Sequence, residues 1–480
     1  MKPQGFPLDP EHIWEHFYQL TRIPRPSRAE AAVRDYVIGQ AEAHDCRWQL
    51  DATGNLVVYV PASPGRERHP TVIIQNHLDM VTVKTGDKQH DFHRDPLTLQ
   101  VEDGWLLADR TTLGADNGVG CAAALALLTD PDVQHPPLEL LFTVDEETGL
   151  GGALGLDASL LSGRVMLNLD TEDWHELYVG CAGGAAWVFS REYPLQPAAE
   201  GTRCWTLEIK GLAGGHSGIE IHLQLGNALK LLVEALADVA SCQLAAASVG
   251  VAHNVIPREG WIRFACDDVD AGALQQRLEA LQRRWCSYLP AADQGVELLL
   301  QPGEPAAVMS AEDSRQLLQV IAALPHGAQA YSPAQPADLV DLSVNLARLQ
   351  LGEGRLELES SIRFFNPEQA AGLRLAVEGL AQLAGLHIRR IDGYPGWQPD
   401  FASPLLARAK ALHERLFDSV PAVKAIHAGL ECGILKSKLP DADILSFGPT
   451  IRGAHSPTER LRIATVPPFW RYLTALLAEL

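Results

Sequence analysis

Apolar and polar residues follow two rhythms along the first 185 residues of the chain. Short, continuous apolar runs are typical of strands buried on both faces of a sheet, and they occur at Asn55–Val60, Thr71–Asn76, Leu138–Val144 and Val165–Leu169. Longer stretches predict helices at Pro10–Thr21, Arg28–His44 and Gly118–Leu128. Alternating strands and helices predict an α/β domain, a mixed sheet flanked by helices.

The pattern changes after the glycine-rich segment Gly180–Gly184. The next elements that we predict are strand Thr206–Lys210, helix His222–Val239, strands Ser248–His253 and Trp261–Ala265, helix Ala271–Trp285 and strand Val296–Leu300. A similar order returns in helix Ala311–Ala323, strands Asp341–Leu349 and Arg355–Phe364, helix Pro367–Leu383 and strand His387–Asp392. This echo predicts an α+β region that is internally doubled.

The alternation of helix-like and strand-like runs seen in the first region returns near the end of the chain. It predicts helix Pro404–Phe417, strand Asp443–Phe447 and helix Pro467–Leu480. We therefore expect a discontinuous α/β domain formed by residues 1–185 and 398–480, with the α+β domain inserted at residues 186–397.

Charge and composition narrow the class of protein. Among 480 residues, 60 acidic residues against 39 basic ones leave a formal charge of −21, which opposes binding to nucleic acid and to anionic membranes. The longest apolar run, Cys121–Leu128, is too short to span a bilayer, and the N-terminus lacks the apolar core of a signal peptide. Eight cysteines without a C-x-x-C pair suit a reducing compartment. We therefore expect a cytoplasmic protein with neither a nucleic-acid nor a membrane partner.

Candidate metal ligands share one kind of position, at or shortly beyond the carboxyl end of an apolar strand, or just before the buried helix. They are His77, Asp116, Glu147, Asp170 and His455, and Asp79 and Glu146 lie beside them. Ligands in open α/β sheets bind at this edge. Each residue alone has an ordinary alternative, such as a solvated strand end or, for Asp116, a helix cap. Their coincidence at one sheet edge favours a metal centre.

Imidazole and carboxylate ligands without thiolates suit two divalent metal ions, with Zn²⁺ expected first and Mn²⁺ or Co²⁺ as substitutes. We expect His77, Asp116 and Asp170 on one ion. On the other we expect Asp116, which both ions share, with Glu147 and His455. Asp79 would accept the N–H of His77 that does not face the metal. The ions would activate a water molecule and polarise a scissile carbonyl, and Glu146 would serve as general base.

The sequence strings around these residues resemble a known clan of dinuclear zinc peptidases, the aminoacylase, carnosinase and carboxypeptidase G clan. Within it they look like the aminoacyl-histidine dipeptidase branch, and the strings are NHLDMV, LGADNGVG, DEETGLGGA, NLDTED, GLAGGHSG, AHNVIPR, HAGLECG and GPTIRGAHSPTER. The resemblance covers essentially the whole chain. It implies hydrolysis of small peptides, Xaa-His dipeptides including β-alanyl-histidine, and a lid role for the inserted domain. Asn117 departs from relatives that carry a second Asp there.

The resemblance also implies substrate contacts, each with a plainer alternative. His216 in GGHSG would stabilise the oxyanion, although a glycine-rich turn is the alternative. Arg363 would bind the terminal carboxylate of the substrate, although without the resemblance it would be interpreted as an ordinary surface arginine. The resemblance implies three further pocket residues, Asn254, His427 and Glu431. Their plainer alternatives are a residue at the start of a strand for Asn254, a residue at the start of a helix for His427 and a solvated carboxylate for Glu431.

Two other functions remain open at this point. The same centre would hydrolyse any amide placed across it, so an N-acyl amino acid amidohydrolase is the nearest alternative. A catalytically inactive binding protein of the same fold is the other, although the complete ligand set argues against it. The sequence also leaves open a homodimer.

Overall fold

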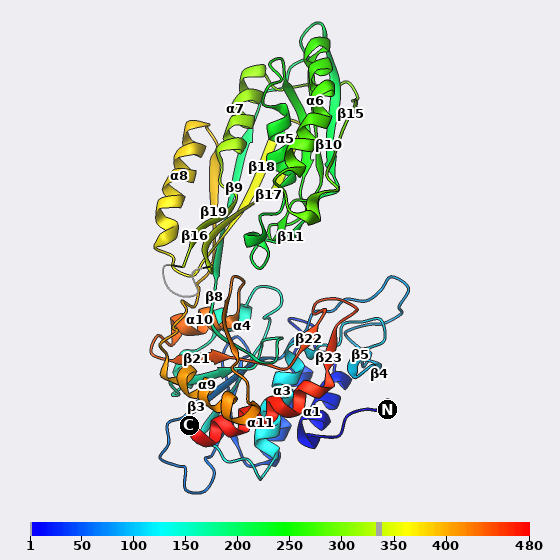
Figure 1. The fold of residues 1–480 in the computed structure, drawn as a ribbon. Helices are drawn as coiled ribbons and strands as arrows, with labels where there is room; N and C mark the ends of the chain where they lie inside the picture. The colour runs from blue at the N-terminus through cyan, green and yellow to red at the C-terminus, as the bar shows by residue number, and fades with distance from the viewer. Residues whose placement is uncertain (1, 333–337) are drawn as a thin grey trace. The chain divides into compact units, whose positions relative to one another are not determined.

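The computed structural model describes residues 2–332 and 338–480, and the chain divides into two compact units (Figure 1). The first unit comprises Met1–Cys181, Trp397–Ala425 and Leu430–Leu480, and the second comprises Ala182–Gly396 and Ile426–Gly429. The division falls at 181/182 and 396/397, a few residues from the predicted boundaries. The sequence pattern did not predict that four residues, 426–429, belong to the second unit.

The first unit contains an eight-stranded mixed sheet. Its strands, in spatial order, are β1 (Arg47–Leu50), β2 (Leu56–Val60), β6 (Leu138–Thr143), β3 (Val72–His77), β7 (Val165–Asn168), β21 (Asp443–Ser446), β8 (Glu176–Cys181) and β20 (Ala422–Ile426). The central strands β6, β3, β7 and β21 are parallel neighbours, whereas β1, β2 and β8 pair antiparallel. The predicted mixed α/β sheet is confirmed.

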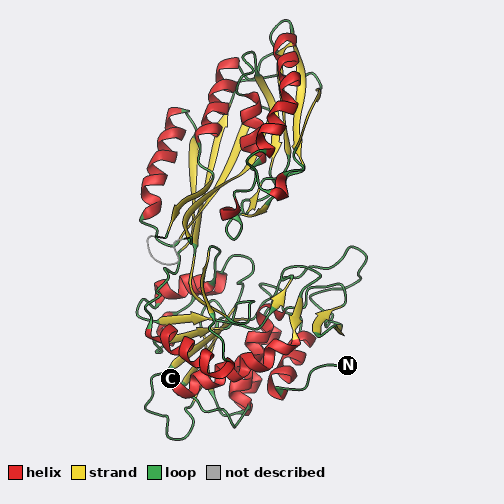
Figure 2. Ribbon diagram, viewed as in Figure 1, coloured by secondary structure: helices red, strands yellow, loops and turns green. Residues whose placement is uncertain are grey.

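Helices and a smaller sheet surround these strands (Figure 2). The helices are α1 (Glu11–Arg22), α2 (Ala31–Ala43), α3 (Ala115–Thr129), α4 (Gly151–Gly155), α9 (Pro404–Phe417), α10 (Glu431–Lys438) and α11 (Val466–Glu479). A four-stranded sheet orders β22 (Ile451–Arg452), β23 (Arg460–Arg462), β5 (Trp105–Ala108) and β4 (Leu99–Glu102). The nearly all-apolar α3 packs against α1, α2 and β3, and its residues 117–127 are all buried, which explains why it lacks a polar face.

The second unit is a long sheet with one layer of helices (Figures 1 and 2). Its strands, in spatial order, are β15 (Glu297–Pro302), β10 (Thr202–Lys210), β14 (Gly260–Asp267), β12 (Gln243–Val249), β17 (Val340–Gly352), β18 (Arg355–Phe364), β9 (Gly183–Glu192) and β19 (His387–Tyr394), with β16 (Gly327–Tyr331) paired to β17. The helices are α5 (Ala228–Leu236), α6 (Asp268–Cys286), α7 (Ala311–Ala323) and α8 (Gln369–Leu383). A separate two-stranded ladder joins β11 (Gly215–His216) to β13 (Val255–Ile256).

The strand order of this unit confirms the predicted doubling. One half runs β10-α5-β12-β14-α6-β15, and the other runs β9-α7-β17-β18-α8-β19. If the strands of each half are numbered one to four along the chain, their spatial orders are 4-1-3-2 and 2-3-1-4. The halves are thus mirrored in order and join where β12 pairs antiparallel with β17. The first half is inserted between β9 and α7 of the second.

Two local predictions were wrong, and one long strand was missed. The helix expected at 222–239 begins only at Ala228, because Asn227 caps it and residues 221–223 form a separate 3₁₀ turn. The strand expected at 248–253 lies at Gln243–Val249, and the chain turns at Gly250, which has a positive φ of 76°. β9 was not predicted, because it starts inside the glycine-rich segment.

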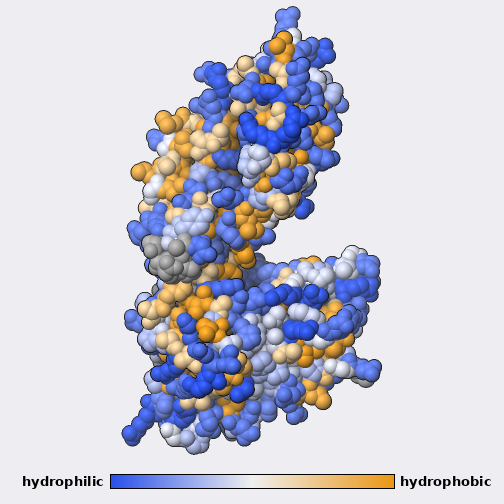
Figure 3. All heavy atoms as spheres, viewed as in Figure 1, coloured by the Kyte–Doolittle hydropathy of each residue, from blue (hydrophilic) through white to orange (hydrophobic). Residues whose placement is uncertain are grey.

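The exposed surface of the second unit carries apolar residues along α8. Leu375 and Leu383 are 74% and 82% exposed, and hydrophobic residues gather over this helix on the face shown in Figure 3. Among the described residues, no helix combines the length and hydrophobicity needed to cross a bilayer.

The late start of α5 generates a stability prediction. The Asn227 side chain accepts hydrogen bonds from the backbone N–H groups of Leu229 and Lys230 and donates to the carbonyl of Leu346. We expect Asn227→Ala to lower the free energy of unfolding by about 2–4 kcal/mol, because it removes a cap and leaves a buried carbonyl unpaired. Urea denaturation measures this loss. Ser310→Ala removes the cap of α7 and a hydrogen bond to the Asp313 side chain but no bond to a buried carbonyl, so an equal loss in both variants would contradict the account.

Candidate metal centre

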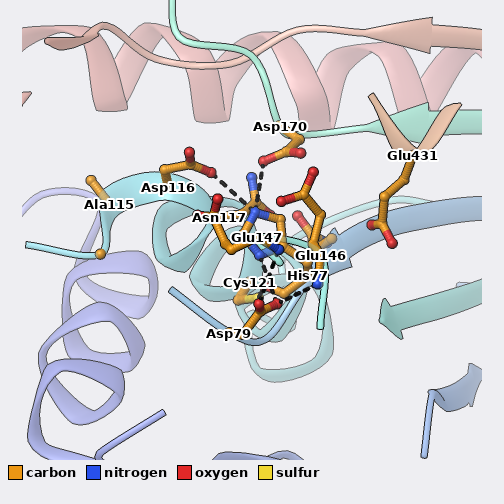
Figure 4. A network of polar contacts seen from close by, with 12 residues as sticks. His77, Asp79, Ala115, Asp116, Asn117, Cys121, Glu146, Glu147, Asp170 and Glu431 are labelled. Atoms are coloured by element: carbon orange, nitrogen blue, oxygen red, sulfur yellow. Dashed lines mark hydrogen bonds and ion pairs between the residues drawn. The ribbon is translucent and has the colours of Figure 1, made fainter. Parts of the chain in front are cut away.

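Parallel pairing in the first unit brings three strand ends to one edge of the sheet. β3 is buried along its whole length and ends at His77, which is 1% exposed. Its neighbours β6 and β7 run parallel to it, so Glu146 and Glu147 beyond β6 and Asp170 beyond β7 emerge beside the imidazole. Figure 4 shows these side chains converging. The predicted convergence of the strand-end residues is therefore present in the fold.

Asp116 lies between the two histidines of the cluster. Its backbone is extended (φ −79°, ψ 113°) at the start of α3, so it does not continue the helix. One carboxylate oxygen, Oδ1, lies 3.0 Å from Nε2 of His77, and the other, Oδ2, lies 3.2 Å from Nε2 of His455. A carboxylate with its oxygens directed at two separate imidazoles has the arrangement of a bridging ligand.

The donor atoms fall into overlapping groups on either side of Asp116. Nε2 of His77 also lies 3.3 Å from Asp170 Oδ1, and Nε2 of His455 lies 3.1 Å from Glu147 Oε2. The groups whose donor atoms lie within 4.8 Å of one another are His77 with Asp116 and Asp170, His77 with Glu146 and Glu147, and Asp116 with Glu147 and His455. The first and third are the two ligand sets that the sequence predicted.

This donor set fits divalent metal ions. Ligands about 2.0–2.1 Å from a tetrahedral ion lie roughly 3.3 Å apart, close to the separations observed here. Glu147 Oε1 and Asp170 Oδ1 are buried atoms without a hydrogen-bond partner in the described part of the chain. Burial, and then the neighbouring Asp116, raise the pKa of Asp170 to about 7. A cation would offset this cost of holding several carboxylates together.

Asp79 joins two of the strand ends. Its carboxylate accepts hydrogen bonds from Ser27 Oγ (2.7 Å) and from the backbone N–H groups of Glu146 (3.1 Å) and Glu147 (3.2 Å). Oδ1 also lies 3.3 Å from Nδ1 of His77. Burial raises the pKa of this carboxyl, but the contacts with His77 and these donors outweigh it and lower the pKa to about 2. An ionised Asp79 therefore orients His77 with Nε2 facing the cluster.

A row of buried polar side chains beneath the centre was not predicted. The side chains of Gln75 in β3, Asn168 in β7 and Ser446 in β21 form a chain of hydrogen bonds across three neighbouring strands. Ser446 donates to Asn168, and Asn168 donates to Gln75. Gln75 Nε2 and Thr143 Oγ1 both donate to Glu431 Oε2, each at 2.6 Å. The residues lie within runs that read as continuously apolar, so hydrophobic periodicity conceals them.

Glu431 belongs to this row, in the first unit. Its side chain is 0% exposed, and Oε1 has no hydrogen-bond partner among the described residues. Burial raises the pKa of Glu431 to about 8. Its expected contact with substrate stays a prediction.

The other four predicted substrate residues lie in the second unit, and three of them are close together. Nδ1 of His216 accepts the N–H groups of residues 218 and 219. A Cβ atom at Gly218 would lie 2.0 Å from the carbonyl of His427 and 2.9 Å from Arg363, so glycine permits this close approach. Asn254 lies next to this loop, with its carbonyl accepting the N–H of Ser217, and its side chain is exposed.

Arg363 and His427 have distinct partners in this unit. The guanidinium of Arg363 lies 3.2 Å from Tyr394 Oη, and none of the ion pairs in the described residues involves it. His427 Nε2 lies 2.7 Å from Ser343 Oγ, and its Nδ1 has no partner there. Burial, then the charge of Arg363, lowers the pKa of His427 to about 3, so this imidazole is neutral at pH 7.

A histidine-and-carboxylate cluster at the carboxyl edge of a mixed α/β sheet has the ligands and the position of a divalent-metal site, and hydrolases use such sites to activate water. Residues 73–479 match the family described as Peptidase family M20/M25/M40, and the chain belongs to that family. It is therefore a metallopeptidase, and its candidate ligands form two groups that share Asp116, as a dinuclear centre requires.

Relatives support this assignment over the whole chain. The chain is 36% identical over 479 residues to a protein of Escherichia coli (strain K12) named cytosol non-specific dipeptidase, covering 98% of each. A crystal structure of aminoacylhistidine dipeptidase from Vibrio alginolyticus is 34% identical, with a TM-score of 0.90 over 98% of this chain and 97% of that one. A Bacillus subtilis structure described as a dinuclear metal binding peptidase from the M20 family shares the fold, at 14% identity and a TM-score of 0.50, covering 97% and 96%.

The geometry predicts that metal binding releases protons. Hydrogen bonds to Asp116 and Glu147 raise the pKa of His455 to about 11, so the metal-free imidazole is protonated at pH 7. A metal ion needs its free Nε2, and the proton must therefore leave. We expect affinity to rise with pH, by about tenfold per unit for each proton released. Competition with a chelator at several pH values measures this slope, and a pH-independent affinity would contradict it.

Proposed function

We propose that this metallopeptidase hydrolyses dipeptides, including Xaa-His dipeptides such as β-alanyl-histidine. It would use two divalent metal ions, with Zn²⁺ as the preferred metal and Mn²⁺ or Co²⁺ as substitutes. The observation that carries the proposal is the position of Asp116, whose two oxygens face two different histidines. The named activities of the Escherichia coli and Vibrio alginolyticus relatives support the choice of dipeptides.

We assign one ion to His77, Asp116 and Asp170 and the other to Asp116, Glu147 and His455. When bound, the ions supply Lewis acidity and an acidified water molecule. Glu146 is the carboxylate of the cluster that is assigned to neither ion, and its backbone N–H donates a hydrogen bond to Asp79. In this assignment Glu146 accepts a proton from the attacking water and returns it to the leaving amine.

The second unit supplies the proposed substrate contacts. Arg363 is half-buried without an acidic partner among the described ion pairs, so it is free to pair with a carboxylate. It lines a cavity of about 230 Å³ together with Tyr394, His253, Ser361 and Gly184. We propose that Arg363 binds the terminal carboxylate of the substrate, and that His216, Asn254 and His427 contact its other polar atoms.

We further propose that the protein acts in the cytoplasm, as the name of the Escherichia coli relative indicates for that protein. Whether two copies associate stays a prediction.

A dipeptide panel with matched controls tests the proposed activity. We expect the wild type to cleave Xaa-His dipeptides, chelation to abolish turnover, and Zn²⁺, Mn²⁺ or Co²⁺ to restore it. Glu146→Gln should keep both metal ions but lower kcat by at least about 100-fold, because only proton transfer is lost. Turnover after complete metal removal, or near-normal kcat in the variant, would refute the assignments. Preference for N-acyl amino acids over dipeptides would favour an amidohydrolase instead.

Arg363→Ala tests the carboxylate contact. We expect kcat/KM to fall by about 1.5–3 kcal/mol equivalent with metal content unchanged, because a charged hydrogen bond is lost. The preference for a free carboxylate over a C-terminal amide should also disappear. The control is Arg348→Ala in β17, which removes an arginine already paired with Glu357 and Glu359. If the wild type cleaves amides equally well, or if Arg363→Ala retains full discrimination, the contact is wrong.

A further inference from the structure

One buried carboxylate holds the loop that presents Asp116. Glu459, which is 2% exposed, accepts hydrogen bonds from four consecutive backbone N–H groups. Oε2 accepts those of Leu113 (2.8 Å) and Gly114 (2.9 Å), and Oε1 accepts those of Ala115 (2.7 Å) and Asp116 (3.2 Å). All four donors at this segment are therefore oriented by a single side chain.

A buried arginine holds the same loop from its carbonyl side. The guanidinium of Arg25, which is 2% exposed, donates to the carbonyls of Gly114, Leu78 (2.9 Å) and Asp79 (2.8 Å). None of the ion pairs in the described part of the chain involves this guanidinium. Its hydrogen bonds thus connect the loop before α3 to the strand end that carries His77 and Asp79.

The glycines of the LGADNG string make room for this arginine. A Cβ atom at Gly114 would lie 2.5 Å from Nη2 of Arg25, and one at Gly118 would lie 2.7 Å from the same atom. Gly114 also has a positive φ of 67°, which side chains disfavour. The glycine spacing is thus explained by the approach of the guanidinium.

We propose that Arg25 and Glu459 are positioning residues for Asp116, binding opposite sides of the loop backbone so that its carboxylate stays directed at both histidines before any ion binds. Neither residue touches the ions or the substrate in this assignment. The inference rests on the proposed function, in which both ions share Asp116. A displaced loop must therefore weaken the two ions together, whereas loss of an unshared ligand weakens one.

The competing interpretation is that Glu459 only stabilises the fold, and the first unit offers a matched residue for that comparison. Glu139 in β6 is 3% exposed, and its carboxylate accepts hydrogen bonds from the backbone N–H groups of Ser162 and Gly163 and from Ser162 Oγ. This turn carries no proposed ligand. Glu139→Gln should therefore lower stability without changing metal binding.

The experiment measures Co²⁺ binding to the full-length protein by titration against a competing chelator, with the visible absorption spectrum and total metal content as readouts. We expect Glu459→Gln to weaken both ions in step by about 10–100-fold, the range seen when a residue supporting a ligand is lost. The Co²⁺ spectrum should change at both ions. Glu139→Gln should retain two ions at wild-type affinity, and His455→Ala should lose one ion selectively.

Arg25→Lys gives an independent second arm if Glu459→Gln does not fold. Lysine keeps the charge but cannot present the planar fork that reaches several carbonyls, so both ions should again weaken together. Wild-type affinity for both ions in either soluble variant would overturn the inference and leave the proposed function intact. Equal weakening in Glu139→Gln would reduce Glu459 to a structural role. A wild type that binds fewer than two ions would overturn both proposals.

Discussion

The metal centre depends on a rigid sheet edge that holds mutually repelling carboxylates close together. Parallel pairing of β6, β3 and β7 forces several carboxylates and an imidazole into one buried site, whether or not the charges attract. Burial, together with like charges, raises the pKa of Asp170 and of Glu146 above their ordinary values. The packing of the unit offsets the free-energy cost of burying these carboxylates together. Divalent ions would remove the repulsion, and the relief would contribute to their binding free energy.

The structure supports the acidic side chains largely through the backbone. Asp79 accepts N–H groups of the Glu146–Glu147 segment, and Glu459 accepts those of the loop before α3. In both cases a buried carboxylate orients main-chain groups, and Asp79 in addition orients the imidazole of His77. Ligand directions are thereby tied to the sheet and helix framework, which is more rigid than a freely rotating side chain.

Much of the centre could be predicted from the sequence, because strand ends are visible in hydrophobic runs and parallel strands place their ends together. That argument alone placed His77, Glu147 and Asp170 at one sheet edge, where the structure has them. Arg25 and Glu459 were not, since each acts on backbone atoms from a distant part of the chain, and no local pattern reveals such a contact. β9 escaped prediction because its first residues are glycines, and the start of α5 was misplaced because a cap at Asn227 outweighed the amphipathic pattern before it.

The nested doubling of the second unit has a consequence for how its loops work together. His216 and Asn254 come from the half that is inserted, whereas Arg363 comes from the half that surrounds it. Because both halves belong to one polypeptide and share one continuous sheet, their local concentration is set by the chain itself. The grouping of His216 with Arg363 therefore forms without any encounter between molecules, and it persists at any dilution at which the unit stays folded.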